Sequence, residues 1–201
     1  MKMKLFTRRF YKYFKTIESE FKGRPVKYME IGVFLGDTAE WMIENVLTHP
    51  DSIYIGIDPW EWFKPFHKRF PTPESWQKKM LDRIDELRKR YKGKALFIKG
   101  FSHEVLRDNP YPFNSFDLIY IDGHHTIQSV LRDYVYSWPL LKINGVMIFD
   151  DYKQGHSDEV RCAVDTILIG LGEINRGAHS RGSKINVLWK DYSVGIRKLK
   201  E

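Results

Sequence analysis

Short apolar runs with no polar face recur along the chain, and turn residues close each of them. Such runs are typical of strands that are buried on both faces of a parallel sheet. The runs that we interpret as strands span residues 26–31, 52–57, 95–99, 116–121 and 146–149. Two further short runs, at 185–190 and 192–198, are joined at Asp191, and we expect them to form a closing antiparallel pair.

Apolar residues at the period of an α-helix separate these runs. They predict helices over residues 5–22, 39–47, 74–92, 126–141 and 158–171, with a break near Pro139 in the fourth. Strands that alternate with helices indicate an α/β fold. We therefore expect a Rossmann-like, doubly wound, mostly parallel seven-stranded sheet that ends in the antiparallel pair. Because no linker or internal repeat divides the chain, residues 1–201 are expected to form a single domain.

Two segments stand apart from this alternation. Residues 1–24 contain an amphipathic helix whose apolar stripe predicts packing on the domain or on a second copy in a homodimer, and whose basic residues allow a lid as the alternative. Residues 59–73 are aromatic, basic and interrupted by proline, which is too irregular for a helix. We interpret them as a substrate cap, although a plain surface loop fits nearly as well.

Composition and charge narrow the class of protein. The hydrophobic share of 42% and the charged share of 29% are ordinary for a globular chain, and the net charge of +7 is more typical of a solvated surface than of nucleic-acid binding. The single cysteine, Cys162, excludes an internal disulfide and fits a reducing compartment. No apolar run has the length of a signal peptide or a membrane span, so we expect a cytoplasmic protein without a membrane partner.

Acidic residues follow the predicted fourth and fifth strands. Asp122 closes the run 116–121, and Asp150 and Asp151 close the next one. The carboxyl ends of parallel strands meet along one edge of a sheet, where open α/β folds bind their ligands. Three carboxylates at such an edge repel one another unless a positive charge lies between them. The sequence therefore predicts a divalent-metal site made by Asp122, Asp150 and Asp151.

The first predicted strand leads into a glycine turn and then a helix. Gly32 allows a close approach, Gly36 opens the helix, and Thr38 offers a hydroxyl to its first turn. Such a turn makes a backbone cradle for an anionic or carboxylate-bearing ligand, and a simple capped turn is the alternative. Asp58 ends the second strand about 20 residues further on, which is where folds of this kind bind a ribose diol.

Two histidines follow Asp122. Neutral histidine suits a general base near pH 7, and His125 lies one short turn beyond the acid. A helix cap or a structural hydrogen bond is the alternative for His125, and packing on a ring is the alternative for His124.

Together, the segments EIGVFLGDT, IGID, IDGHH and FDDY resemble the class I S-adenosylmethionine-dependent methyltransferases. Within that superfamily the chain resembles the metal-dependent small-molecule O-methyltransferases, such as catechol O-methyltransferase and the enzymes that methylate sugars on macrolides. The resemblance covers residues 26–152. It implies S-adenosylmethionine and Mg²⁺, or another divalent metal, as cofactors.

The resemblance also implies roles for individual residues. The methionine end of the cofactor is expected near Glu30, Gly32, Gly36 and Thr38, with the ribose on Asp58. The adenine is expected between Pro59 and His124, with its edge near Ser102 and His103, and Asp122 borders the cofactor as well as the metal. The metal ligands correspond to Asp122, Asp150 and Asp151. Catechol enzymes carry a catalytic lysine three residues past the first metal acid, and His125 occupies that position here.

The function that follows is metal-assisted O-methylation of a hydroxyl on a small molecule or sugar. RNA methylation is an alternative that the positive charge favours, but RNA ribose methyltransferases carry a lysine where this chain has Asp150 and Asp151. A nucleotide-dependent oxidoreductase is a second alternative, although the three-glycine pattern is missing. A cofactor-binding scaffold without activity is a third. Sugar hydroxyls, a catechol and other vicinal diols all fit as acceptors.

Overall fold

The structure is a computed structural model that describes residues 11–61, 73–108, 110–153, 158–172 and 182–201. Among these residues, no helix is long and apolar enough to cross a membrane. Most of the predicted substrate cap, residues 62–72, lies outside the described residues, and so do residues 1–10, which include the start of the predicted N-terminal helix. The cap therefore stays a prediction, as do the domain bounds, the homodimer and the cytoplasmic location.

A seven-stranded sheet runs through the molecule in the order β3-β2-β1-β4-β5-β7-β6. The neighbouring strands from β3 to β5 are parallel, whereas β7 runs antiparallel to both β5 and β6. The strands are β1 (Lys27–Ile31), β2 (Ile53–Asp58), β3 (Ala95–Lys99), β4 (Phe116–Ile121), β5 (Leu141–Phe149), β6 (Ile185–Lys190) and β7 (Val194–Lys198). The predicted doubly wound sheet with its antiparallel end is confirmed.

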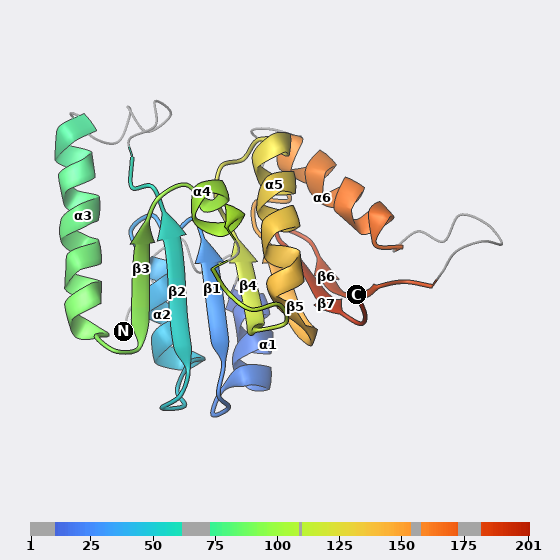
Figure 1. Ribbon diagram of the computed structural model, residues 1–201, viewed down its shortest axis with the longest axis horizontal. Helices are drawn as coiled ribbons and strands as arrows, with labels where there is room; N and C mark the ends of the chain where they lie inside the picture. Colours follow the sequence, from blue (N-terminus) through green and yellow to red (C-terminus); the bar gives the residue numbers. More distant parts are fainter. Residues whose placement is uncertain (1–10, 62–72, 109, 154–157, 173–181) are drawn as a thin grey trace.

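Helices cover both faces of the sheet (Figure 1). The helices are α1 (Tyr11–Phe21), α2 (Asp37–Asn45), α3 (Pro73–Arg90), α4 (Ser102–Arg107), α5 (Ile127–Ser137) and α6 (Glu159–Gly170), with a 3₁₀ turn, η2 (Trp138–Leu140), after α5. Buried side chains of α1, α2 and α3 belong to one apolar cluster, and those of α4, α5 and α6 to another. The alternation of side chains along each strand divides them between the two clusters, as expected for a sheet buried on both faces.

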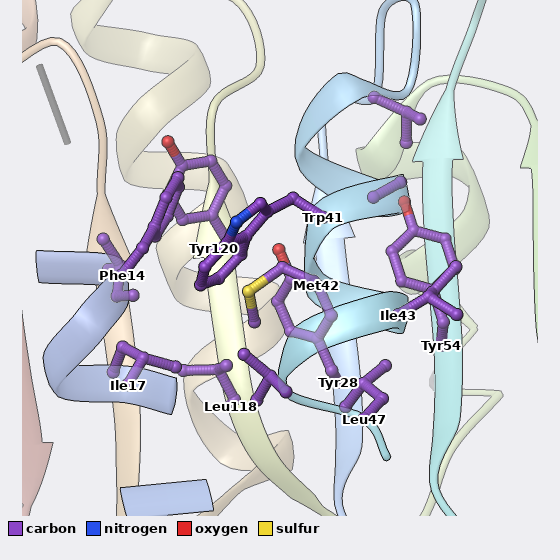
Figure 2. Close-up of a cluster of buried hydrophobic side chains, with 14 of the residues drawn as sticks. Phe14, Ile17, Tyr28, Trp41, Met42, Ile43, Leu47, Tyr54, Leu118 and Tyr120 are labelled. Atoms are coloured by element: carbon purple, nitrogen blue, oxygen red, sulfur yellow. The ribbon is translucent and has the colours of Figure 1, made fainter. Parts of the chain in front are cut away.

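The cluster under α1 and α2 is rich in aromatic side chains. Figure 2 shows Phe14 of α1 and Trp41 of α2 against Tyr120 of β4. The rings of Phe14 and Trp41 stack with centroids 5.1 Å apart. Tyr13, Phe14, Ile17 and Phe21 are all buried, so the described part of the N-terminal helix packs on its own domain.

Two elements differ from the sequence prediction. Helix α4 was not predicted, because it has six residues and buries only Leu106, which is too little for a helical period to show. Strand β5 begins at Leu141 rather than at residue 146, and its pairing with β4 shifts register between Phe116 and Leu118. Asn144, at a φ of 66°, lies within this irregular stretch. The predicted break near Pro139 is the 3₁₀ turn η2.

The strand order places β1 between β2 and β4, so the chain reverses its direction of progress across the sheet next to β1. Ligands of open α/β sheets bind at such a reversal, outside the carboxyl ends of the strands. The loops after β1, β2, β3, β4 and β5 therefore make up the rim where a site is expected.

Candidate active site

The glycine turn after β1 is closed tightly against β4. Gly32 has a φ of +89°, and a Cβ atom on it would lie 1.9 Å from the carbonyl oxygen of Asp122. Gly36, at a φ of +74°, precedes the first residue of α2 and lies beneath Leu87 of α3. The packing of the chain therefore requires glycine at both positions, whether or not a ligand also approaches them. Thr38 lies in the first turn of α2, as predicted.

Asp58 fastens this turn to the end of β2. Its Oδ2 atom accepts hydrogen bonds from the backbone N–H groups of Val33 (2.8 Å) and Phe34 (2.9 Å), and its Oδ1 atom accepts one from Trp60 (2.6 Å). Burial raises the pKa of Asp58, and the three donors oppose that rise. The sequence placed Asp58 on the rim correctly but did not indicate that its carboxylate accepts backbone hydrogen bonds from the neighbouring turns. Contact with a ribose stays a prediction, and so does the contact of Pro59 with adenine.

Glu30 lies in the core below the rim. It is 1% exposed, and its Oε2 atom accepts hydrogen bonds from the hydroxyl groups of Tyr54 (2.9 Å) and, weakly, of Tyr28 (3.4 Å). Burial raises its pKa well above the ordinary value of 4.5. The predicted contact between Glu30 and the methionine end of a cofactor stays a prediction.

The turn after β3 contacts a buried acid that the sequence did not reveal. The Ser102 hydroxyl donates a hydrogen bond to Oδ1 of Asp133, which comes from α5 and is 3% exposed. Burial raises the pKa of Asp133 to about 6, against the effect of Ser102. An acid within an amphipathic helix gives no signal of its own in a sequence. The ring of His103 lies 5.7 Å from that of Phe101, and its predicted role at the adenine edge stays a prediction.

A carboxylate and imidazole cluster lies at the ends of β4 and β5. The Nε2 atom of His125 is 3.0 Å from Oδ2 of Asp151 and 3.8 Å from Oδ1 of Asp122. One ligand atom from each of the three residues lies within 4.8 Å of the others. Asp151 has a φ of 55°, a conformation that aspartate tolerates better than most residues.

The electrostatics of this cluster depend on its net charge. The nearby carboxylates of Asp122 and Asp151 raise the pKa of His125 to about 10, which favours the cationic imidazole near neutral pH. Burial raises the pKa of Asp122 to about 6, although His125 opposes that rise. A protonated histidine cannot accept a proton. The predicted base role of His125 therefore requires another cation that neutralises Asp122 and Asp151 in its place.

Asp150 lines the same small pocket as Asp122 and His125, but its carboxylate oxygens are held by other groups. Its Oδ2 atom accepts a hydrogen bond from the buried Tyr120 hydroxyl, and its Oδ1 atom accepts one from the backbone N–H of Asp151 (2.8 Å). The structure thus brings together Asp122 and Asp151 of the predicted metal ligands, but it places His125 rather than Asp150 beside them. His124 is exposed, with its Nδ1 atom 3.3 Å from the hydroxyl of Thr126, the residue that caps α5.

Comparison with known proteins identifies the class. A family described as a methyltransferase domain matches residues 29–152, which is 124 of the 201 residues. An uncharacterized protein of Acanthamoeba polyphaga mimivirus is 26% identical over 189 residues, covering 90% of this chain and 76% of that protein.

Solved structures share the fold at low identity. The O-methyltransferase NovP superposes with a TM-score of 0.66 at 15% identity, covering 94% of this chain and 80% of that one. A protein of Corynebacterium glutamicum gives 0.61 at 14% identity, with 96% and 82% covered. The methyltransferase MycE, in complex with Mg and SAH, gives 0.61 at 13% identity, with 98% and 54% covered.

The fold, the glycine turn and the rim acids define a class I methyltransferase that uses S-adenosylmethionine. The chain belongs to the methyltransferase-domain family, which its residues 29–152 match.

Proposed function

We propose that this methyltransferase transfers the methyl group to a hydroxyl oxygen of a small molecule or sugar, with help from a divalent cation. The observation that carries the proposal is the cluster of Asp122, His125 and Asp151 at the ends of two neighbouring strands. Three relatives by fold support the class of acceptor: NovP is an O-methyltransferase, CalS11 is a TDP-rhamnose 3′-O-methyltransferase, and MycE is seen in complex with Mg, SAH and mycinamycin VI.

The residues of the cluster fit a divalent cation. Asp122 and Asp151, from two neighbouring strand ends, would supply oxygen ligands, and the imidazole of His125 would lie beside them with its nitrogen left for a proton. The imidazole of His125 lies beside both acids, and its raised pKa favours the charged form, which supports a preference for positive charge at this position. Bound there, a divalent cation supplies positive charge that favours ionisation of a nearby hydroxyl group.

The chain's own residues do the remaining work. With a cation held by Asp122 and Asp151, these acids would no longer raise the pKa of His125, and its neutral imidazole could accept the hydroxyl proton. Gly32 keeps the turn after β1 close to Asp122. The turn expected to bind the methyl donor is thereby held next to the acids expected to bind the methyl acceptor. Orientation of the two reactants contributes most of the acceleration expected here, on the order of 7–11 kcal/mol.

The experiment measures formation of S-adenosylhomocysteine from S-adenosylmethionine over a panel of sugars, nucleotide sugars and catechols. Addition of a chelator is expected to abolish turnover, and Mg²⁺ or Mn²⁺ is expected to restore it. Full turnover in excess chelator would rule out the cation. Turnover only with RNA, or only with amines, would rule out the proposed acceptor.

A second arm tests His125. We expect His125→Ala to lower turnover by roughly 10²-fold or more, because a positioned base contributes about that factor. The affinity for S-adenosylhomocysteine, measured by calorimetry, is expected to stay within about twofold of the wild type. A twofold change corresponds to a difference in binding free energy of less than about 0.7 kcal/mol, since a tenfold change corresponds to about 1.4 kcal/mol. A large loss of affinity would make His125 a cofactor-binding residue instead.

A further inference from the structure

Asp133 is a buried acid that the reaction outlined above does not use. It lies on α5 and is 3% exposed, and a carboxylate so deeply buried lowers stability unless it is well paired. Within the described part of the chain, its carboxylate receives a side-chain hydrogen bond from Ser102 and from no other residue. A single neutral hydroxyl is little compensation for a buried charge.

The second oxygen of Asp133 faces the loop after β4. A Cβ atom on Gly123 would lie 3.1 Å from Oδ2 of Asp133, so a side chain larger than glycine would cover this oxygen. Asp133 therefore lies between two loops of the rim: Ser102, which follows β3, and Gly123, which follows β4. These loops flank the ends of β1 and β2, where the cofactor of an open α/β sheet binds.

The other rim acids are already engaged by the chain. Asp58 accepts three backbone hydrogen bonds, and Asp150 accepts one from Tyr120 and one from a backbone N–H. Asp122 and Asp151 share His125. The second oxygen of Asp133 accepts no hydrogen bond from the described residues, and Asp133 has no imidazole beside it, unlike Asp122 and Asp151. A purine that sits on this rim needs an acceptor for its exocyclic amino group, and a carboxylate oxygen is the strongest acceptor a protein offers.

We propose that Asp133 is the residue that makes the cofactor site specific for adenine: Oδ2 accepts a hydrogen bond from the 6-amino group, while Ser102 holds the carboxylate in place through Oδ1. The absence of a side chain at Gly123 keeps the path to Oδ2 open. Discrimination against a base with a carbonyl at the 6-position follows, because that oxygen would face a carboxylate and repel it.

The test uses two ligands that differ at one group: S-adenosylhomocysteine and S-inosylhomocysteine, in which oxygen replaces the 6-amino group. Calorimetry on the full chain gives the affinity for each. The wild type is expected to prefer the adenosyl ligand by roughly 10- to 100-fold, the range for a hydrogen bond to a charged group. Equal affinity for both ligands in the wild type would overturn the proposal.

The variants separate recognition from a purely structural tie between α4 and α5. Asp133→Leu is expected to remove the preference, and Asp133→Asn to reduce it, because a neutral amide accepts less strongly and its NH₂ group favours the carbonyl. Ser102→Ala is expected to weaken the preference less than Asp133→Leu does, since the carboxylate remains but loses the hydroxyl that positions it. The exposed Asp82→Asn on α3 is the control for a change of charge alone.

Circular dichroism confirms that each variant is folded, and if Asp133→Leu does not fold, Asp133→Asn decides. A merely structural Asp133 predicts that both affinities fall together and that their ratio is the same in every variant. That result would overturn the proposal. So would a Ser102→Ala chain that loses the preference as completely as Asp133→Leu.

Discussion

The two halves of the rim hold their acids in different ways. At the ends of β1 and β2, Asp58 is bound by three backbone N–H groups of the chain itself. At the ends of β4 and β5, Asp122 and Asp151 share one imidazole whose side chain is 51% exposed. Both halves carry carboxylates at the ends of parallel strands. Position after a strand therefore does not by itself decide whether an acid is held by the backbone or by another side chain.

The two halves differ in the interactions that each acid would give up in order to bind a ligand. Backbone donors are fixed by the fold, so Asp58 cannot leave them without opening the glycine turn. A half-exposed histidine can be displaced at small cost, because exposed ion pairs contribute only about 0–1 kcal/mol. The β1–β2 half is therefore a rigid part of the fold, whereas the β4–β5 half is available to a cation.

Asp58→Ala gives the largest effect on stability that this comparison predicts. The substitution leaves three backbone N–H groups near the rim without their acceptor, and we expect the free energy of unfolding to fall by about 2–4 kcal/mol. Urea denaturation followed by circular dichroism measures the change. Asp122→Asn is the matched substitution in the other half, and we expect it to cost less than about 1 kcal/mol. Equal losses in the two variants would remove the distinction between the halves.

Glu30→Gln probes the buried acid of the β1–β2 half through pH. The folded pKa of Glu30 lies above its ordinary value of 4.5, so the wild type loses stability as pH rises above that value, until the folded pKa is reached. Glutamine does not titrate. We expect the variant to gain roughly 1–2 kcal/mol on the wild type between pH 5 and 7, within the limit of 1.36 kcal/mol per pH unit. Parallel stability profiles for the two chains would show that Glu30 is ionised in the fold.

His125→Gln probes the β4–β5 half and gives the smallest change, below about 1 kcal/mol because the histidine is half exposed. The folded pKa of about 10 exceeds the unfolded value of 6.5, so the stabilisation is fully present below pH 6.5 and is lost as pH rises through 10. Thermal unfolding in EDTA is expected to show the largest gap between variant and wild type near pH 6.5. A gap that widens toward pH 10 would contradict the pairing.

Sequence patterns predicted the parts of the site that depend on strand ends. A run of apolar residues fixes where a strand stops, and the acid or glycine that follows must then lie on the rim; this placed Gly32, Asp58 and Asp122 correctly. The direction of a side chain is a different matter. Asp150 and Asp151 are neighbours, yet one turns toward Tyr120 and the other toward His125, and these partners lie 30 and 26 residues away in the chain.

Other features gave no sequence signal for physical reasons. The Ser102–Asp133 hydrogen bond joins residues 31 positions apart, and its acid lies on an ordinary amphipathic helix. The short helix α4 and the early start of β5 depend on local packing and on a register shift, which periodicity does not record. The three backbone donors on Asp58 come from turns whose geometry only the folded chain defines.

Titration of the metal-free chain with Mn²⁺, followed by calorimetry, tests the central claim most directly. The wild type is expected to bind one ion, and both Asp122→Asn and Asp151→Asn are expected to weaken binding by at least about tenfold, since affinity follows the number of charged ligands. Asp150→Asn is expected to bind nearly as well as the wild type, because its carboxylate is held by Tyr120. A wild type that binds no ion, or an Asp150→Asn chain that loses binding while Asp151→Asn keeps it, would contradict the account.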